Sequence, residues 1–325
     1  MKLHQNEILF KDAILATSQQ LGIREIYVEK DYWVTYALFH IYTNEIGKET
    51  IFKGGTSLSK CFQLIERFSE VIDLVIKRNN SDTGNQLKRK LKQISTSVSC
   101  ELPEIEINGI TNKVGMIRKT AHTYPRMLTG NFGQVRDIII VESSWLGSFE
   151  PYTTKSVNSF IYKMLLENNQ QSLIETYQLG PFEVTVMDPK RTLCEKIMSL
   201  VRFSNTQNPI SDLKNKIRHV YDLHLILRDI SMRSFFESSQ FDNMLTEVGT
   251  DDIESFKNNN DWLKRHPSEA LIFSKTEETW LQIKEIYTGS FSELIIGNIP
   301  HEFEIMRTLT EVSKRLKTIE WSLPL

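Results

Sequence analysis

The sequence predicts an α+β protein with a mixed sheet in its N-terminal half and a mainly helical C-terminal part. Three observations lead to this prediction: helical spacing of apolar residues at the N-terminus, several short β-branched segments between residues 50 and 190, and helical spacing again from Arg191 to about Leu316. The chain has 325 residues, 40% hydrophobic and 25% charged, which is enough for one large domain or two of average size. We expect a first domain over residues 1–187 and a helical C-terminal domain over residues 188–325.

In the first domain, segments with the helical spacing of apolar residues alternate with short segments typical of strands. Residues 5–20 and 25–44 have helical spacing, "TIFKGG" predicts a short buried strand that stops at glycine, and residues 56–67 return to the helical period. A basic helix is expected over residues 84–98. The further expected strands are "VIDLVIK" (71–77), the antiparallel set "EIEINGI" (104–110), "VGMIRKTAHTYP" (114–125) and "VRDIIIVESSW" (135–145), and "PFEVTVMDP" (181–189). In the C-terminal part, loops are expected at residues 204–212 and 257–261.

Bulk properties exclude several classes of protein. The net charge is −2, so the chain is no simple polycation and any contact with nucleic acid must come from a local basic patch. "LKRKLK" (87–92) would suit an RNA backbone, although a solvated helix surface explains the same run. Three cysteines without metal-like spacing fit a reducing compartment. The N-terminus is no signal peptide, and no run reaches 18 apolar residues, so we expect a cytoplasmic protein without a membrane partner.

Two glycines end a predicted strand and precede two hydroxyl residues in "FKGGTS". Because Gly54 and Gly55 lack Cβ atoms, a phosphate can approach the backbone N–H groups at the start of the next helix. Thr56 and Ser57 can cap that helix or contact a phosphate oxygen. We assign these four residues, with Lys53 before them, to nucleotide binding. Taken alone, an ordinary turn explains them equally well.

An aspartate follows on the next predicted strand. In phosphoryl-transfer sites, alternating acids on such a strand hold Mg²⁺ against the triphosphate, and Asp73 in "VIDLVIK" occupies one such position. The alternate residue on the same face is Val71, because side chains two residues apart share a face of a strand. An isolated aspartate of an edge strand would give the same pattern.

Two later segments add polar residues at helical spacing. "DPKRTLCEKIMSL" (188–200) begins with Asp188 as a helix cap and proline at the first helical position, and it carries Lys196 within the helix. "IRHVYDLHLIL" (217–227) places Arg218 and Asp222 four residues apart, on one helical face. A solvated lysine and a surface ion pair would explain each segment taken alone.

Taken in order, these segments resemble the AbiEii family of nucleotidyltransferase toxins, which belong to type IV toxin–antitoxin and abortive-infection systems. The matching stretches are "FKGGTSLSK", "RFSE-x-IDL", "P-x-RTL-x-EKIMSL" and "RHVYDLHLIL", with "EKDYWV" before them, so the resemblance spans Glu29 to Leu227. It implies a polymerase-β-like nucleotidyltransferase sheet with a helical C-terminal part that closes over the active-site cleft. It also implies transfer of a nucleotide from an NTP, in some relatives onto tRNA acceptor ends, and an antitoxin encoded beside the toxin, with phage defence as the biological role.

The resemblance assigns a role to each matching residue. Gly54 to Ser57 correspond to the phosphate-binding turn, and Asp73 to the second acid of the metal-binding Asp-x-Asp. Lys196 corresponds to a lysine that contacts NTP phosphates, and Asp222 to an acid that orients a nucleophile or a basic partner. Arg218 would neutralise phosphate or hold Asp222 in place.

Further polar residues are weighed against simpler interpretations. Glu142, at the end of "VRDIIIVE", is the candidate for a third carboxylate, so that Asp73 and Glu142 would hold Mg²⁺ or Mn²⁺; a strand-end surface glutamate is the alternative. Lys30 and Asp31 in "EKDYWV" would line the same cleft or lie on the helix surface.

The sequence departs from the family pattern at Val71, where the family has an aspartate. A valine removes a charged oxygen ligand, and Glu70 cannot replace it because adjacent strand residues point to opposite faces. The chain is therefore a degenerate member, or carries an inactivating substitution, or manages weak metal binding with Asp73 and Glu142. A nucleotidyltransferase and a nucleotide- or partner-binding protein of the same fold both remain open. A small-molecule kinase is disfavoured because the sequence lacks a G-x-x-x-x-G-K-[ST] loop.

Overall fold

The computed structural model describes residues 1–130 and 135–324, and the chain divides into two compact units. The first unit comprises Met1–Cys61, Phe68–Trp145 and Tyr152–Met187, and the second comprises Phe62–Arg67, Leu146–Pro151 and Asp188–Leu325. Two short segments from within residues 1–187 therefore belong to the second unit. The predicted domain boundary after residue 187 stays a prediction.

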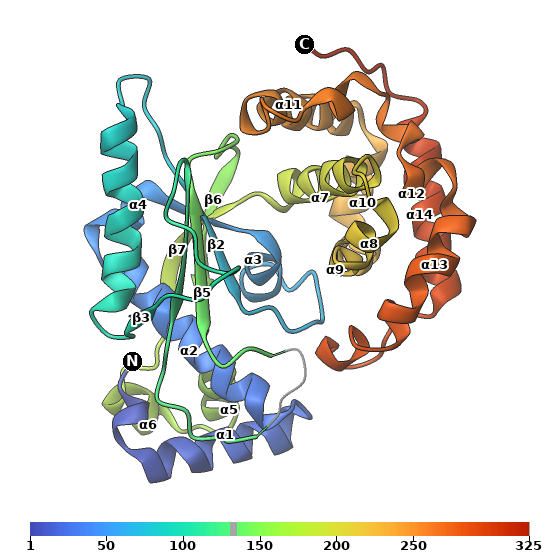
Figure 1. Cartoon of the computed structure of the whole chain (residues 1–325). Coiled ribbons are helices and arrows are strands. Elements are labelled where there is room, and N and C mark those ends of the chain that lie inside the picture. The colour runs from blue at the N-terminus through green and yellow to red at the C-terminus, as the bar shows by residue number, and fades with distance from the viewer. Residues whose placement is uncertain (131–134, 325) are drawn as a thin grey trace. The chain divides into compact units, whose positions relative to one another are not determined.

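A mixed seven-stranded sheet organises the first unit, in the order β3-β4-β5-β2-β1-β7-β6 (Figure 1). The pairs β2–β5 and β1–β7 are parallel, and the remaining neighbours are antiparallel. This confirms the predicted α+β class with a mixed sheet. The strands are β1 (Thr50–Lys53), β2 (Val71–Ile76), β3 (Glu104–Ile105), β4 (Ile117–His122), β5 (Ile139–Ser144), β6 (Tyr152–Val157) and β7 (Phe182–Met187).

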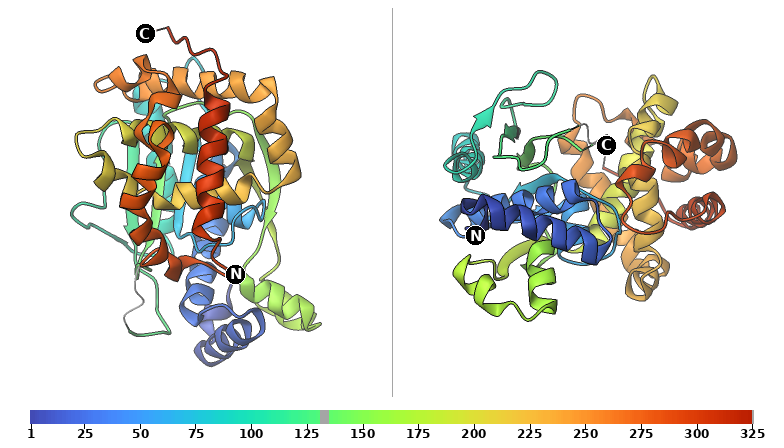
Figure 2. Two further views of the ribbon diagram at one scale, coloured as in Figure 1. Left: turned by 90° about the vertical axis from the view of Figure 1, so that its right-hand side faces the viewer. Right: turned by 90° about the horizontal axis from the view of Figure 1, so that it is seen from below.

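Helices α2 (Glu25–Tyr42) and α4 (Gly84–Ser99) pack against each other and against the central strands. Helix α4 begins at a capping box of Thr83 and Gln86 and buries an apolar stripe at helical spacing. The buried residues of that stripe are Leu87, Leu91, Ile94 and Val98. Helices α1 (Glu7–Leu21) and α5 (Phe160–Glu167) pack beside α2, and α6 (Gln171–Thr176) packs on α5 (Figure 2). Short 3₁₀ turns lie at Leu3–Gln5 and Glu45–Glu49.

The second unit is helical, as the spacing after residue 191 predicts. Its first helix is α7 (Pro189–Ser204), whose N-terminus is capped by Asp188 with proline at the first position. The other helices are α8 (Pro209–Lys214), α9 (Ile217–Ile226), α10 (Ile230–Glu237), α11 (Ser239–Ser255), α12 (Leu271–Ser274), α13 (Thr276–Thr288) and α14 (Glu302–Leu316), with 3₁₀ turns at Asp261–Lys264, Pro267–Glu269 and Ser292–Leu294.

The helix predicted over residues 56–67 is wrong at both ends. Helix α3 runs over Gly54–Lys60, after which Gln63 adopts a positive φ of 55° that an α-helix cannot continue. Residues 62–67 instead belong to the second unit, within which the backbone N–H of Ile296 donates to the carbonyl of Glu66 at 2.8 Å. Tertiary hydrogen bonds have overridden the local apolar period in this segment.

Smaller differences follow from weak local signals. The strand expected over 104–110 is reduced to β3, and α8 begins inside the expected loop 204–212, with Pro209 at its first turn. Strand β6 and helices α5 and α6 were not assigned from the sequence. Within the described residues, none of the helices has the length and apolar character needed to span a membrane.

Candidate functional site

Four charged residues lie side by side across the first unit's sheet. Lys53 of β1 pairs with Asp73 of β2, Asp73 with Glu142 of β5, and Glu142 with Lys119 of β4. Registered partners on adjacent strands point to the same face, so these residues form one line, which we call the charged row. Lys119 Nζ lies 2.9 Å from Glu142 Oε2, and each side chain is about one third exposed. The predicted carboxylates Asp73 and Glu142 are thus neighbours.

The charged row occupies the sheet face that α4 does not cover. Arg118, which precedes Lys119 and therefore points to the opposite face, donates from Nε to Ser95 Oγ of α4 at 2.7 Å. Alternation along β4 places Lys119, and with it the whole row, on the other face. Lys53, Asp73 and Glu142 are each partly exposed there.

Gly54 is required by the aspartate of the row. It has a φ of 78°, a region that costs L-residues with side chains about 1–2 kcal/mol. A Cβ atom built at this position would lie 2.3 Å from Asp73 Oδ2. The missing side chain therefore admits the Asp73 carboxylate against the backbone, which is a reason for the glycine that the sequence analysis did not consider.

The two hydroxyls after the glycines are buried and bonded within the first unit. Thr56 Oγ1 donates to the carbonyl of Val71 and can accept from Ser69 Oγ, which lies 3.0 Å away. Ser57 Oγ donates to the carbonyl of Gly54 at 2.9 Å. Neither residue caps α3, because the helix already begins at Gly54 and its N-cap is Lys53. The expectation of a hydroxyl cap is wrong, and a contact of these hydroxyls with phosphate stays a prediction.

Val71 points to the same face as Asp73 but into apolar surroundings. Its registered partner on β5 is Ile140, and it packs, partly buried, against the cluster of Ala121, Ile138 and Ile140. An aspartate here would face the side chain of Ile140. The neighbours of position 71 are thus suited to the valine.

The motif "EKDYWV" forms buried anchors for loops. The Glu29 carboxylate accepts from the backbone N–H groups of Met127 and Leu128, and Lys30 donates to the carbonyls of Arg136 and Ile138. Burial lowers the pKa of Lys30 to about 8. The suggestion that Lys30 lies on the helix surface is wrong, since none of its side chain is exposed.

Asp31 is the third buried charge of this motif. Its carboxylate accepts from Lys60 Nζ at 2.6 Å and from the backbone N–H of Phe160 at 2.8 Å. Only 4% of the residue is exposed, so a position on the helix surface is wrong for Asp31 as well. It ties α3 and the start of α5 to α2, which makes its role in the first unit one of positioning.

In the second unit, Asp222 is held by two cations. Arg67 donates from Nε and Nη2 to the two carboxylate oxygens at 2.6 and 2.8 Å, and Lys196 Nζ donates to Oδ2 at 2.7 Å. All three side chains are nearly or fully buried, and we call them the Asp222 cluster. Burial by itself would raise the pKa of Asp222, but the two cations outweigh it and hold the pKa below its usual range.

His219 completes the surroundings of Lys196. Its Nδ1 lies 3.3 Å from Lys196 Nζ, and burial together with the neighbouring cations holds the pKa of His219 well below its usual value. A neutral imidazole can accept a hydrogen bond from the ammonium. Lys196 is therefore engaged by Asp222 and His219, and its assignment to an NTP phosphate stays a prediction.

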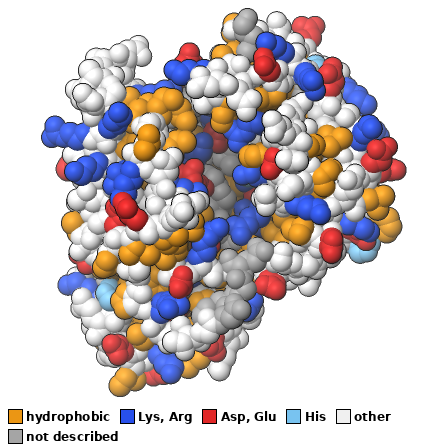
Figure 3. Space-filling view, in the orientation of Figure 1, with side chains coloured by type: hydrophobic (Ala, Val, Ile, Leu, Met, Phe, Trp, Pro, Cys, Tyr) orange, Lys and Arg blue, Asp and Glu red, His pale blue; other side chains and the backbone are white. Residues whose placement is uncertain are grey.

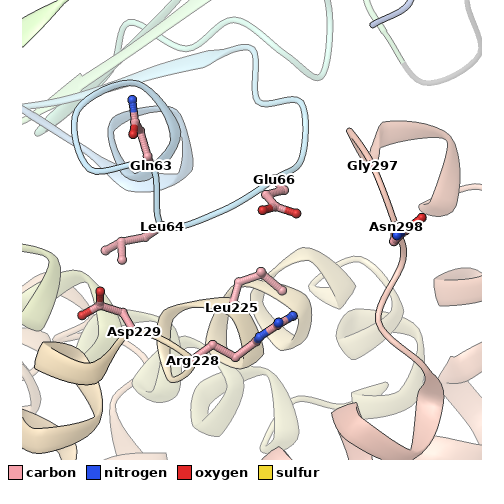
Figure 4. Close-up of a pocket in the computed structure, with 8 residues that line it drawn as sticks. All are labelled: Gln63, Leu64, Glu66, Leu225, Arg228, Asp229, Gly297 and Asn298. Carbon is pink, nitrogen blue, oxygen red and sulfur yellow. The ribbon is translucent and has the colours of Figure 1, made fainter. Parts of the chain in front are cut away.

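The second unit also contains a polar pocket of about 570 Å³ (Figure 4). Glu66 from the segment before β2, Arg228 and Asp229 from the corner after α9, and Asn298 contribute to its lining. Among the described residues that line it there is none of the predicted site residues. The pocket is therefore distinct from the Asp222 cluster.

Comparison with known families assigns the chain to a protein family. The family model described as "Nucleotidyl transferase AbiEii toxin, Type IV TA system" matches residues 36–304, which is most of the chain. The chain belongs to the AbiEii family. It is therefore a nucleotidyltransferase by class, and the type IV system implies an NTP as substrate and an antitoxin as partner.

Among solved structures, the chain is similar to the nucleotidyltransferase toxin MenT4 from Mycobacterium tuberculosis H37Rv. The two share 13% sequence identity, with a TM-score of 0.48, over 95% of this chain and 99% of that chain. None of the curated proteins matches the chain.

The residues of an AbiEii metal site are incomplete in this chain. Of the three carboxylates expected, Asp73 and Glu142 are present and Val71 replaces the other. Glu142 already pairs with Lys119, and no group of three or more His, Cys, Asp or Glu suited to a metal ion occurs within residues 1–130 and 135–324. Catalytic Mg²⁺ keeps near-octahedral oxygen coordination, usually through carboxylates and phosphates. The residues present do not fit a site of the expected kind.

Arg67 is the residue that the sequence analysis missed. The role of holding Asp222 was given to Arg218, four residues away on α9, whereas the structure gives the bidentate pair to Arg67, 155 positions away in sequence. Its place in "RFSE" of the family match was the available signal, and no local periodicity could have connected it to α9. The role of Arg218 itself stays a prediction.

Proposed function

We propose that this AbiEii member binds an NTP at the charged row and transfers its nucleotide to the acceptor end of tRNA, with slow turnover because of Val71. The observation that supports this most directly is the pair of Asp73 and Glu142 on adjacent parallel strands, beside the Gly54 turn. The family resemblance predicts Asp73 as an acid and the glycine turn as a phosphate-binding turn, and Glu142 is the candidate for a further carboxylate. The proposed activity belongs in the cytoplasm, where NTPs and tRNA are available.

Lys196 and Asp222 enter the proposal through motif order. We propose that the C-terminal domain, residues 188–325, contributes them to the active-site cleft of the nucleotidyltransferase domain, residues 1–187. The distances within the Asp222 cluster support a positioning role for Asp222, which fixes the ammonium of Lys196 through the 2.7 Å contact. Lys196 would act on phosphate as a point charge, and His219 can accept one of its protons in a hydrogen bond.

An RNA acceptor is supported by the charge on α4. Lys88, Arg89 and Lys92 are exposed on the helix side away from its buried stripe, and Figure 3 shows Lys and Arg side chains at the edge of the molecule where α4 lies. Ammonium and guanidinium groups spaced along one helix face can neutralise consecutive backbone phosphates. This makes an RNA acceptor more consistent with the chain than a small neutral acceptor.

A second candidate is a protein that binds nucleotide or a partner but has lost transfer. It is favoured by the apolar surroundings of Val71, because Ile140 and Ala121 are not neighbours that a metal-binding carboxylate would need. The two candidates differ in one measurable property, which is turnover.

The test compares the chain with its Val71→Asp and Val71→Asn variants. Asparagine matches aspartate in shape and polarity but carries no charge, so it controls for the loss of valine packing. Each protein is incubated with labelled NTPs, Mg²⁺ and total RNA, and then with purified tRNA whose 3′ ends are intact or removed. Faster transfer by Val71→Asp alone, onto intact tRNA, supports the proposal. Absence of transfer by all three proteins favours the second candidate.

A further inference from the structure

The charged row suggests how a triphosphate is bound when the metal ligands are incomplete. We propose that Lys119, together with Lys53, binds the triphosphate of an NTP without a divalent ion, and that Lys119 competes with such an ion for Glu142. This inference rests on the proposed function, since it concerns the same nucleotide site. It adds a nucleotide-binding residue, Lys119, and a metal-independent mode of binding.

The charges of the row are balanced. Two ammonium groups and two carboxylates give a formal sum of zero, and they alternate so that each carboxylate has a lysine as its registered neighbour. A site with three carboxylates and no lysine would carry a formal charge of −3 and would repel a triphosphate until metal ions were bound. Here Val71 removes one negative charge, and the lysines balance the two that remain.

Lys119 is placed to compete with a divalent ion for Glu142. Its ammonium lies 2.9 Å from Glu142 Oε2, which places a positive charge beside one of the two carboxylates expected to hold the ion. A divalent ion that used Glu142 would have to displace this ammonium or tolerate its repulsion. With 32% of its side chain exposed, Lys119 keeps further N–H donors for a phosphate oxygen from solvent.

The two lysines do not belong to a sheet face that is polar throughout. The next residues along the same face, Val71, Ile140 and Ala121, form an apolar cluster, and Val75 and Ile51 on the other side of the row are buried. Ser144, in register with Val75 on the same face, is a partly exposed polar residue, so the row is a charged band with mostly apolar neighbours. A binding group that fits such a band is linear and polyanionic, as a triphosphate is.

One substitution should change the affinity for triphosphate and the affinity for a divalent ion in opposite directions. Lys119→Gln removes the ammonium, so triphosphate binding should weaken while binding of a divalent ion should strengthen. Because Lys119 is only partly exposed, solvent screens its charge incompletely, and we expect at least about a tenfold change in each affinity. A substitution that only damaged the fold would weaken both kinds of binding.

The experiment uses four full-length proteins: the unchanged chain, Lys119→Gln, Lys119→Arg and the matched control Lys11→Gln, an exposed lysine of α1. Calorimetry in EDTA measures binding of inorganic tripolyphosphate and of GTP, and electron paramagnetic resonance measures binding of Mn²⁺ alone. We expect the unchanged chain to bind both anions in EDTA, and Lys119→Gln to bind them at least about tenfold more weakly and Mn²⁺ at least about tenfold more tightly. Lys119→Arg keeps the positive charge, so it should bind the anions more tightly than Lys119→Gln, and Lys11→Gln should behave like the unchanged chain.

Two results would overturn the inference alone. One is that the unchanged chain binds GTP only when Mg²⁺ is added; in that case the proposed function survives and metal-independent binding fails. The other is that Lys119→Gln leaves both affinities unchanged or lowers both. If neither GTP nor any other NTP binds the chain with or without Mg²⁺, the proposed function fails together with the inference.

Discussion

Asp222→Asn is the substitution whose effect follows most directly from the distances in the structure. The carboxylate accepts two hydrogen bonds from Arg67 and one from Lys196, and it is fully buried. Asparagine keeps the shape but removes the charge, and its NH₂ group presents a donor to partners that are themselves donors. Two buried cations would then lie next to each other without a counter-ion.

The expected cost is about 3–5 kcal/mol of unfolding free energy, the range for removing one partner of a buried ion pair. Domains have total stabilities of about 5–15 kcal/mol, so the loss should be visible without special conditions. The sign of the pH dependence follows from the lowered pKa of Asp222. Its contribution to stability is complete above the unfolded pKa of 3.8 and is lost as pH falls through the folded pKa, so the difference between the two proteins should shrink in acid.

The assay is urea unfolding of the chain and of Asp222→Asn at pH 7 and at successively lower pH. Glu237→Gln, an exposed residue at the end of α10, serves as a matched control and should change stability by no more than about 0.5 kcal/mol. A loss below about 1 kcal/mol for Asp222→Asn at pH 7 would refute the description of the cluster as a buried charge network. Unchanged stability with lost nucleotide transfer would instead identify Asp222 as a catalytic residue.

Three further predictions concern the first unit. Val71→Asp should transfer nucleotides at least about a hundredfold faster than the unchanged chain and inhibit bacterial growth on expression, because roughly 3 kcal/mol of transition-state stabilisation is restored. Gly54→Ala should lose about 1–3 kcal/mol of stability, since its φ is 78° and its Cβ would collide with Asp73 Oδ2, as urea unfolding would measure. In the unchanged chain, the free energy of unfolding should rise by roughly 2–3 kcal/mol between pH 8 and 10, because the pKa of Lys30 is about 8 in the folded chain and the unfolded chain binds the extra proton. Lys30→Met should abolish this rise.

Each of these predictions has its own control and contrary result. Matched expression levels and the Val71→Asn protein control the first, and equal transfer and toxicity of Val71→Asp and the unchanged chain would show that position 71 is no metal ligand. Gly84→Ala, at a position with open space for a Cβ, controls the second. A Gly54→Ala protein as stable as the Gly84→Ala protein would show that Asp73 moves aside without cost. The third prediction fails if the pH profiles of Lys30→Met and the unchanged chain are parallel.

The sequence alone determined the local elements and the kind of chemistry. Strands β1, β2 and β7 and helices α2, α4 and α7 were predicted within a few residues, because glycine turns, capping residues and the two hydrophobic periods are signals encoded in neighbouring residues. The order of the motifs indicated the AbiEii family, which the family comparison confirmed. The replacement of the family's aspartate by Val71 was also visible in the sequence, since alternation along a strand fixes which residues share a face.

Only the tertiary structure decided which charges meet. The alternation of residues along a strand predicts which face a side chain points to, but not which strand lies beside it. The contact of Lys119 with Glu142 therefore depends on the register of β4 and β5. The parallel pairing of β2 with β5 depends on the chain between them. The same limit hid the bond from Arg67 to Asp222, because an ion pair across 155 positions leaves no trace in local spacing. Local physics sets the period of each element, whereas the partners of its side chains are chosen by packing of the whole chain.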